Sequence, residues 1–365
     1  MTHRSKYTAA LAAAGLLFAS VASASAEELR IFNWADYFGA DTVANFQTET
    51  GIDVSLDYYD SNEVLETKLL AGGSGYDLVF PATSNAVREF QAGALAEIDT
   101  SKLSNYGNLN PKILASLDQV PGGRKIGVPY TWGTVGIAYN AKLVAERIGD
   151  QPLNSLDVIF KPEIAEKLKD CGIAVLDSPF EISSVALNYL GADPYTNNAD
   201  DLKKAEDLLA TAAKSVRYFH NQRATNDLAS GDICVALIYS GDAGIAAMRA
   251  EEAGNGVEVG YAIPQEGTLM WIDLMAIPAD APNAAAAYKF IDYMLKPEVV
   301  AEVTNLVYFA NANKEADAHV DPAILGDENV YPGDEVMGRL FPDKTLGAKE
   351  QRLRTRLWTK VKTGQ

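Results

Sequence analysis

The sequence predicts an α/β fold with two lobes that face each other across a cleft. Short apolar strands alternate with amphipathic helices from Glu28 to about Gly191, which is typical of α/β rather than all-β proteins. A chain of 365 residues is long enough for two domains. Two extended segments, 134–140 and 268–278, are predicted to be the strands by which the chain leaves the first lobe and returns to it. Lobes joined by strands, without a flexible linker, predict a hinge.

The first 26 residues are predicted to be a cleavable secretory signal. Arg4 and Lys6 precede an apolar run from Ala9 to Ala22, and Ala24-Ser25-Ala26 matches an A-x-A cleavage site. An N-terminal membrane anchor is the alternative, but the apolar run is short and interrupted. No later stretch approaches the roughly 20 apolar residues of a membrane span. We therefore expect an exported protein.

The charge of the mature chain limits its partners. The signal carries two of the 31 basic residues and none of the 49 acidic ones, which leaves 29 basic residues and a formal charge of −20. This balance argues against nucleic acids and anionic membranes as partners, and it mildly favours cationic ones.

The two cysteines, Cys171 and Cys234, lie at or within the predicted strands 172–176 and 233–239. An isolated pair in an exported protein predicts one disulfide. Such a bridge would close a loop of about 60 residues and stabilise the fold by about 4 kcal/mol in the chain-entropy model. Two buried free thiols are the alternative.

The remaining elements follow from periodicity and from turn residues. Helices are expected at 41–50, 60–70, up to 91 after the loop 81–85, 161–169, 181–190, 199–213, 222–229, 283–295, 297–305 and 349–362. Strands are expected around 31–32 and at 53–58, 76–80, 125–129, 216–219 and 257–263, with a bend at 130–133 and loops from 100 to 124. Asp60 and Glu63 are predicted to form a capping box. We assign 27–135 and 265–330 to lobe I, 136–264 to lobe II, and 331–365 to C-terminal helices that pack across the lobes.

Signals for catalysis are scarce. His3 falls in the signal, and His220 and His319 are far apart in the chain. The sequence has neither H-E-x-x-H nor G-x-S-x-G, and the glycine run 72–75 lacks the lysine of a phosphate-binding loop. An exported carbohydrate-active enzyme would need a carboxylate pair around a sugar bond, and no spacing singles one out. We expect no enzyme, no metal and no cofactor.

Aromatic rings beside carboxyl or amide groups recur at the ends of predicted elements. The five clusters are Trp34, Asp36 and Tyr37; Asp177, Phe180 and Glu181; Tyr239 and Asp242; Trp271 and Asp273; and Tyr308, Phe309 and Asn311. Each cluster alone is also explained by core packing or helix capping. Together they predict a site for a slender organic cation, because rings can enclose methylene groups while carboxylates hold ammonium groups.

Longer segments carry a family resemblance over essentially the whole mature chain. They are N-W-A-D-Y-F at 33–38, D-S-N-E-V-L-E at 60–66, K-L-L-A-G-G at 68–73, Y-D-L-V-F-P at 76–81, L-N-Y-L-G at 187–191, N-D-L-A-S-G-D-I-C-V-A at 226–236, F-A-N-A-N at 309–313 and R-T-R-L-W-T-K-V-K at 354–362. The sequence resembles the periplasmic putrescine- and spermidine-binding proteins of bacterial ABC importers, and their putrescine-type branch most.

The resemblance implies a class II periplasmic-binding-protein fold whose two lobes close over a polyamine and then dock on an inner-membrane permease. It implies a monomer in the periplasm without a cofactor, and a bridge between Cys171 and Cys234. The implied ligand-binding residues are the rings of Trp34, Tyr37, Tyr239, Trp271 and Phe309, the acids Asp36, Glu181, Asp242 and Asp273, and the hydroxyl of Ser84.

Departures from the family pattern affect the choice of ligand. Ala35 and Ala82 stand where hydroxyl residues are common, which leaves Thr83 or Ser84 as substitutes for the second. Tyr239 replaces a usual Trp, and Phe309 replaces a usual Tyr. These changes keep the rings but remove hydrogen-bonding groups. Another small cation, such as agmatine, is therefore the alternative ligand.

The resemblance also suggests which polyamine is preferred. The position of Trp271 is often Phe in putrescine receptors and Trp in spermidine receptors. Trp offers the strongest ring face to a cation. The smaller Tyr239 and Phe309 leave more space in the cleft. We therefore expect spermidine to be preferred over putrescine.

Overall fold

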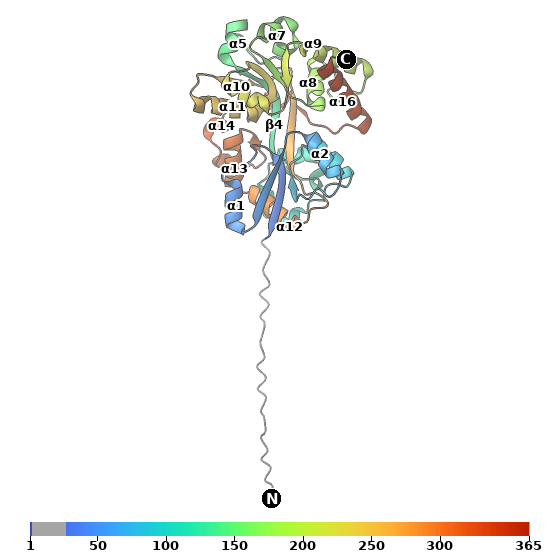
Figure 1. Ribbon diagram of the computed structural model, residues 1–365, viewed down its shortest axis with the longest axis vertical. Coiled ribbons are helices and arrows are strands. Elements are labelled where there is room, and N and C mark those ends of the chain that lie inside the picture. The colour runs from blue at the N-terminus through green and yellow to red at the C-terminus, as the bar shows by residue number, and fades with distance from the viewer. Residues whose placement is uncertain (2–26, 365) are drawn as a thin grey trace.

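The computed structural model describes Met1 and residues 27–364, so the predicted signal lies, apart from Met1, outside the described residues. The folded part consists of two α/β lobes, one above the other (Figure 1). Helices α1, α2, α12 and α13 belong to the lower lobe, and α5 and α7 to α11 belong to the upper one. The predicted α/β class is confirmed.

The lower lobe is built on parallel strands. β1 (Glu28–Trp34) pairs with β2 (Asp53–Tyr59) on one side and with β3 (Leu78–Val79) on the other. Backbone bonds of 2.9 Å run in both directions between Val79 and Ala276, directly after β9 (Leu269–Met275). These bonds join β9 to the sheet of the lower lobe.

The long strand β4 (Val128–Asn140) passes through both lobes. It pairs with β9 up to Thr134, and from Val135 onward it pairs with β7 (Val235–Tyr239) and β8 (Val259–Ala262). This change of partner lies beside the predicted crossing between the lobes, whose boundaries stay a prediction.

The predicted break at 130–133 is wrong, because β4 continues through it with only a shift in register between Pro129 and Trp132. Neighbours on both edges explain the difference. β9 pairs with Trp132 and Gly133 on one side, and β10 (Ala310–Asn311) pairs with Thr131 and Trp132 on the other. Tertiary pairing therefore overrides the local bend signal.

The sheet of the upper lobe places the two cysteines side by side. β5 (Ile173–Val175) lies parallel to and between β6 (Val216–Phe219) and β7. Cys171 lies two residues before β5 and Cys234 lies directly before β7, and they form a disulfide with a Cα–Cα distance of 5.5 Å. The prediction of a bridge is confirmed.

The helices follow the predicted order with local corrections. Their bounds are α1 Thr42–Thr50, α2 Asn62–Leu70, α3 Thr83–Gln91, α4 Pro111–Leu117, α5 Ala141–Ile148, α6 Asp157–Phe160, α7 Pro162–Leu168, α8 Pro179–Tyr189, α9 Ala199–Ala212, α10 Arg223–Ser230, α11 Ser240–Ala253, α12 Ala284–Met294, α13 Pro297–Val307, α14 Pro322–Leu325, α15 Asp334–Met337 and α16 Ala348–Thr363. Ser61, not Asp60, caps α2, because its side chain accepts from the backbone N–H of Val64. α4 lies in a stretch predicted as loop; Asn110 caps it and Pro111 starts it.

Across Met1 and 27–364, no helix combines the length and the apolarity that crossing a membrane requires.

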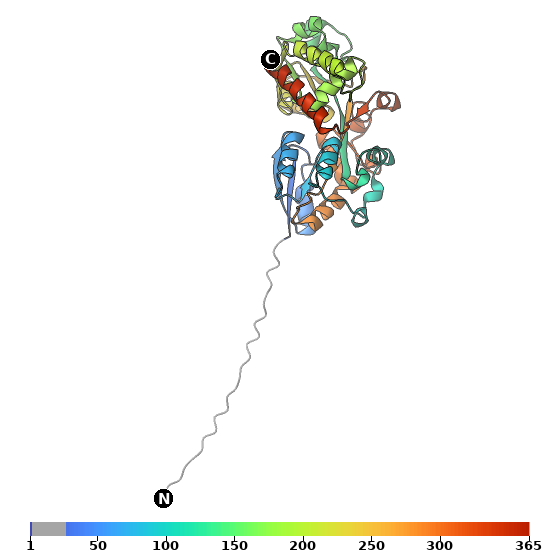
Figure 2. The ribbon, with the colours of Figure 1, turned by 90° about the vertical axis from the view of Figure 1, so that its right-hand side faces the viewer.

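The C-terminal tail contacts elements of both lobes. β11 (Phe341–Pro342) pairs with β9, and the following Asp343 accepts a bond of 3.1 Å from the backbone N–H of Ser84 in α3. α16 then lies along the upper lobe (Figure 2) and packs on α8 and α9. The buried guanidinium of Arg354 fixes it there by donating to Ser183 Oγ at 2.9 Å.

Candidate ligand-binding cleft

A cavity of about 180 Å³ lies where elements of the two lobes meet. The turn after β1, the first turns of α8 and α11, and β9 all open into it. Its lining residues are Trp34, Ala35, Asp36, Tyr37, Asn62, Ala82, Glu181, Asn221, Gln222, Thr225, Asn226, Tyr239, Asp242, Ile245, Arg249, Trp271, Asp273 and Phe309. The strand ends predicted from the sequence therefore meet at one place, as the carboxyl ends of strands do in ligand-binding α/β proteins.

Asp273 is the most enclosed acid of the cleft. It lies on β9 and accepts a bond of 2.8 Å from the hydroxyl of Tyr37, which also contacts Thr131. The hydroxyl of Tyr130 donates a hydrogen bond of 2.6 Å to the backbone carbonyl of Tyr37 and so fixes its backbone. Burial raises the pKa of Asp273 well above its usual range, and the nearby Glu181 raises it further. Tyr37 thus positions a carboxyl group that forms no ion pair with any residue among Met1 and 27–364.

Two further acids occupy equivalent places in the upper lobe. Glu181 and Asp242 are each the third residue of a helix, α8 and α11 respectively, where the helix dipole favours a negative charge. Burial outweighs this effect and raises the pKa of both carboxyl groups to about 7. Glu181 accepts a bond of 2.7 Å from the hydroxyl of Tyr239, while Arg249 partly offsets the rise for Asp242.

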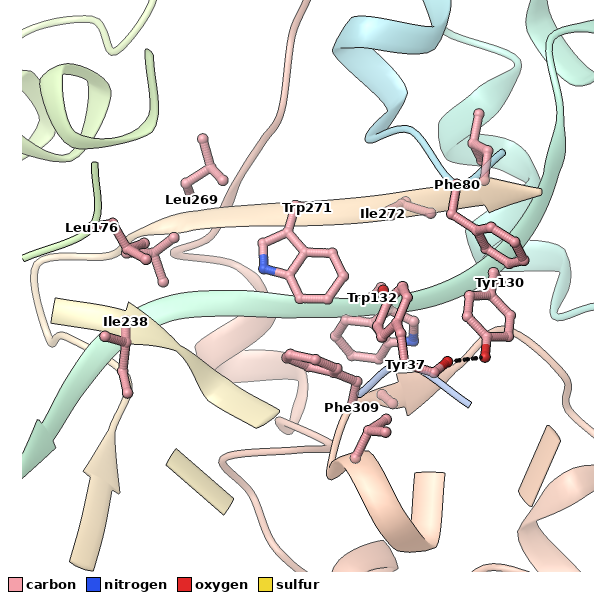
Figure 3. Packing of buried hydrophobic residues seen from close by; sticks show 14 of the residues in the cluster. Tyr37, Phe80, Tyr130, Trp132, Leu176, Ile238, Leu269, Trp271, Ile272 and Phe309 are labelled. Carbon is pink, nitrogen blue, oxygen red and sulfur yellow. Dashed lines mark hydrogen bonds between the residues drawn. The ribbon is translucent and has the colours of Figure 1, made fainter. Parts of the chain in front are cut away.

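Four aromatic rings form a wall beside these acids. The ring of Trp271 meets that of Phe309 edge to face at 4.9 Å between centroids, and it meets Tyr239 at 5.8 Å. Phe309 continues to Tyr37, also at 5.8 Å. Figure 3 shows Trp271 projecting from β9 toward Phe309, with Tyr37 beyond them. We define these residues, Tyr239, Trp271, Phe309 and Tyr37, as the aromatic wall.

Small residues make this packing possible. A Cβ atom at Gly133 would lie 2.7 Å from the indole of Trp271 and 3.2 Å from the ring of Phe309. A Cβ at Gly241 would lie 2.6 Å from the same ring of Phe309. Both distances of less than 3 Å exclude a side chain, so the two glycines let the rings approach the backbone of β4 and α11.

Asp36 lies at the mouth of the cleft and is largely exposed. Its backbone has a φ of 54°, and its carboxylate pairs with the guanidinium of Arg249 at 3.0 Å. Asn226 binds the other side of that guanidinium at 2.8 Å. Because Asp36 follows β1 and Arg249 lies on α11, the pair connects the two lobes. The role of Asp36 as a polar ligand contact stays a prediction, and the structure adds this ion pair with Arg249.

The structure brings nine of the ten predicted ligand residues to the cleft, and Ser84 is the exception. Ser84 is buried at the start of α3, and its backbone and side chain bond to Asp343 and Asn85. Thr83, the other candidate, donates to the carbonyl of Ile272 at 2.8 Å. Ser84 lines a narrower side chamber that adjoins the cleft.

Sequence reasoning missed the polar side of the cleft. Asn62, Asn221, Gln222, Thr225, Asn226 and Arg249 all line it. The sequence pattern could have predicted part of this polar side, since the run from Asn221 to Asn226 follows the carboxyl end of β6, and ligands bind at that edge of such sheets. Within Met1 and residues 27–364, no group of three or more His, Cys, Asp or Glu side chains could hold a metal ion.

Comparison with known proteins assigns the chain to a family. Residues 41–327 match the model of the bacterial extracellular solute-binding proteins. The chain belongs to this family.

Two relatives of known function cover nearly its whole length. A putrescine-binding periplasmic protein of Pseudomonas aeruginosa is 46% identical over 98% of this chain and 97% of its own. A putrescine-binding periplasmic protein of Escherichia coli is also 46% identical, over 99% and 98%. A solved putative spermidine/putrescine ABC transporter from Listeria monocytogenes is 30% identical, with a TM-score of 0.82 over 93% of this chain and 100% of its own.

Family membership confirms two predictions. The chain has the two-lobed fold of periplasmic solute-binding proteins. It is a binding protein and not an enzyme, which removes the carbohydrate-active alternative. The ion pair and the wall described above therefore lie in the cleft of a solute-binding protein.

The raised pKa values of Glu181 and Asp242 predict how the stability of the ligand-free protein depends on pH. Both acids bind a proton in the folded state up to about pH 7 but, with ordinary pKa values of about 4, not in the unfolded state. Their contribution to the free energy of unfolding is therefore present at pH 4 and is lost as the pH rises through 7. We expect urea unfolding to show a loss of about 5 kcal/mol between pH 5 and pH 8, since each acid contributes about 1.4 kcal/mol per pH unit over about two units.

The double variant Glu181→Gln/Asp242→Asn, whose amides do not titrate, should lose much less over the same range. Equal losses in the two proteins would show that these acids have ordinary pKa values in the folded state.

Proposed function

We propose that the protein is a periplasmic receptor that captures a linear polyamine in its cleft and delivers it to an inner-membrane ABC permease. One observation carries the choice of ligand. The buried carboxyl groups of Glu181 and Asp273 and the partly buried one of Asp242 face a cavity in which Arg249 is the single cationic side chain among the described lining residues. Arg249 is already paired with Asp36. The cleft of the unliganded protein therefore lacks positive charge.

A polyamine supplies that charge. Its primary amines resemble the lysine side chain, whose pKa is about 10.4, so they are cationic at neutral pH. An ammonium group placed against a buried carboxyl group replaces its proton and forms a charge-assisted hydrogen bond. Ligands that carry a carboxylate would instead meet repulsion from the same acids. The site thus selects against amino acids and for amines.

The aromatic wall suits the hydrocarbon part of such a ligand. Trp271 and Phe309 present apolar faces to the methylene groups between two ammonium ends, and the ring faces also attract the adjacent charge. The two lobes supply different acids, Asp273 from β9 and Asp242 from α11. A diamine that binds both would hold the lobes together, which is the property a receptor needs if its closed form docks on a permease.

The periplasmic location and the permease partner are inferred from the relatives. The two bacterial proteins that are 46% identical are periplasmic binding proteins for putrescine. The predicted secretory signal at 1–26 would export this protein to the same compartment.

Removing one carboxylate tests the assignment of the acids. We expect Asp242→Asn and Asp273→Asn each to weaken putrescine and spermidine binding by about 2–5 kcal/mol, because a buried ammonium group loses its ion partner. Isothermal titration calorimetry measures the loss. Asp41→Asn is the matched control, since Asp41 is exposed and its side chain caps nothing.

The melting temperature of the ligand-free variants should not fall below that of the wild type, because each amide replaces an acid whose ionisation in the folded protein is unfavourable. Unchanged dissociation constants in both variants would contradict the polyamine site.

The indole of Trp271 is expected to favour the longer polyamine. Trp271→Phe should weaken spermidine by about 0.5–2 kcal/mol, the scale of one cation–π contact, and putrescine by less. Titrations of both ligands, with agmatine as a third, measure the preference. A wild type that prefers putrescine, or a variant that weakens both ligands equally, would contradict this role for Trp271. Tighter binding of agmatine than of either polyamine would change the ligand assigned to the cleft.

A further inference from the structure

The basic C-terminal helix α16 binds a residue that leads into the cleft. The indole Nε1 of Trp358 donates to Asp177 Oδ1 at 2.7 Å, and Lys362 Nζ donates to Asp177 Oδ2 at 2.6 Å. Asp177 lies between β5 and α8, the helix whose first turn carries Glu181. Trp358 is buried and packs edge to face on Phe219 at the end of β6, with 5.0 Å between the ring centroids. α16 thus fixes the carboxyl ends of β5 and β6, where the loops to the cleft begin.

Asp177 belongs to one of the five predicted clusters of rings and acids, and the structure gives it contacts of another kind. It is not among the described residues that line the cleft or the side chamber. Both of its carboxylate oxygens bind α16. Its backbone N–H donates at 2.8 Å to Asn221 Oδ1. Asp177 therefore connects α16 to a residue that does line the cleft.

Asn221 extends this connection to the lower lobe. It follows β6 of the upper lobe, and its Nδ2 donates at 2.9 Å to the backbone carbonyl of Asp60, which directly follows β2 of the lower lobe. An amide has one acceptor side and one donor side. Because the acceptor side binds Asp177, the donor side is held toward the opposite lobe.

The polar side of the cleft contacts the lower lobe at two places. Asn221 binds Asp60, and Asn226 binds Arg249, which pairs with Asp36. Such bonds exist only while the lobes are this close, so each of them stabilises the closed form relative to an open one. A single exposed hydrogen bond adds little to the stability of a fold. It can still shift an equilibrium between two forms that differ by only a few kcal/mol.

We propose that Asn221 is a positioning residue that fastens the closed form of the protein, and that α16 holds it in place through Asp177. We call the bonded series from Trp358 and Lys362 through Asp177 and Asn221 to Asp60 the Asn221 bridge. This inference rests on the proposed capture of a polyamine between the lobes. The bridge determines how long a ligand is held, and it acts equally on short and long ligands because it does not depend on ligand length.

Asp177→Ala tests the bridge without changing a residue of the cleft lining. The variant loses both bonds to α16 and keeps the backbone N–H that binds Asn221, so this loop is no longer fixed. Calorimetric titration should show putrescine and spermidine binding weakened by the same factor of about threefold to tenfold, the scale of one hydrogen bond. Stopped-flow measurements should place this factor in the dissociation rate constant, because the bridge forms only once the lobes have closed.

Glu206→Ala is the matched control for the lost charge and the lost contact with α16. Glu206 accepts a bond of 3.1 Å from Lys360 of α16, but it lies on α9 and is not among the described residues of the cleft lining. Its removal should change the dissociation constants by less than about twofold. Equal effects of Glu206→Ala and Asp177→Ala would overturn the bridge, because a general loosening of α16 would then explain both.

A double-mutant cycle with Asn221→Ala shows whether Asp177 acts through Asn221. Asn221→Ala alone also removes part of the cleft lining, so its effect includes any lost contact with the ligand. The double variant should bind putrescine within about twofold of Asn221→Ala alone. Effects that add up would overturn the bridge. So would wild-type affinity of Asp177→Ala, or a loss that differs between putrescine and spermidine.

Lobe closure without ligand separates this inference from the proposed function. Single-molecule energy transfer between dyes on cysteines introduced at the exposed Thr67 of α2 and the exposed Lys214 after α9 reports closure. The two native cysteines form a disulfide, which leaves the dyes to the introduced ones. Asp177→Ala should lower the ratio of closed to open molecules about threefold to tenfold relative to Glu206→Ala.

An unchanged ratio would overturn the bridge, whatever the ligand. A wild type that binds no polyamine would overturn the proposed function, and the ratio of closed to open molecules would still decide the bridge.

Discussion

Burial of carboxyl groups without cations is the constraint around which the cleft is built. Glu181, Asp242 and Asp273 are enclosed at the junction of the lobes, and Asp343 lies in the adjoining chamber. Removing a carboxylate from water costs several kcal/mol unless a cation or a proton neutralises it. In the unliganded protein, bound protons neutralise these carboxyl groups, as the pKa of about 7 for Glu181 and Asp242 indicates. A cationic ligand can use the same sites and adds its own hydrogen bonds.

The strands that connect the lobes make this arrangement possible. β9 carries Trp271 and Asp273 two residues apart on one face, and β4 pairs with β9 before it enters the upper sheet. Gly133 pairs with Trp271, and its lack of a side chain leaves room for the indole beside the backbone of β4. The wall and the central acid are thus fixed by the same backbone pairing that joins the lobes. Movement of α8 and α11 with the upper lobe would carry Glu181 and Asp242 toward or away from them.

Local sequence patterns predicted much of this arrangement. Trp271 and Asp273 could be predicted as neighbours because strand periodicity places residues i and i+2 on one face. Glu181 and Asp242 could be predicted as site residues because each follows a predicted strand and begins a helix. The continuity of β4 could not be predicted from local sequence, since it depends on pairing with β9 and β10, which lie more than 130 residues away in the sequence. The same holds for Asp343. It reaches the site only because β11 pairs with β9, and no local signal marks that contact.

Exchange of protons for a cation is measured most directly by the protons that leave the protein when a polyamine binds. Calorimetric titration of putrescine at pH 6.5, in buffers of different ionisation enthalpy, gives this number. Acids with a pKa of about 7 are mostly protonated at that pH, so about one to two protons should be released per ligand, and the affinity should rise with pH from 6 to 8. Binding without proton release, and with the same affinity across this range, would contradict the exchange.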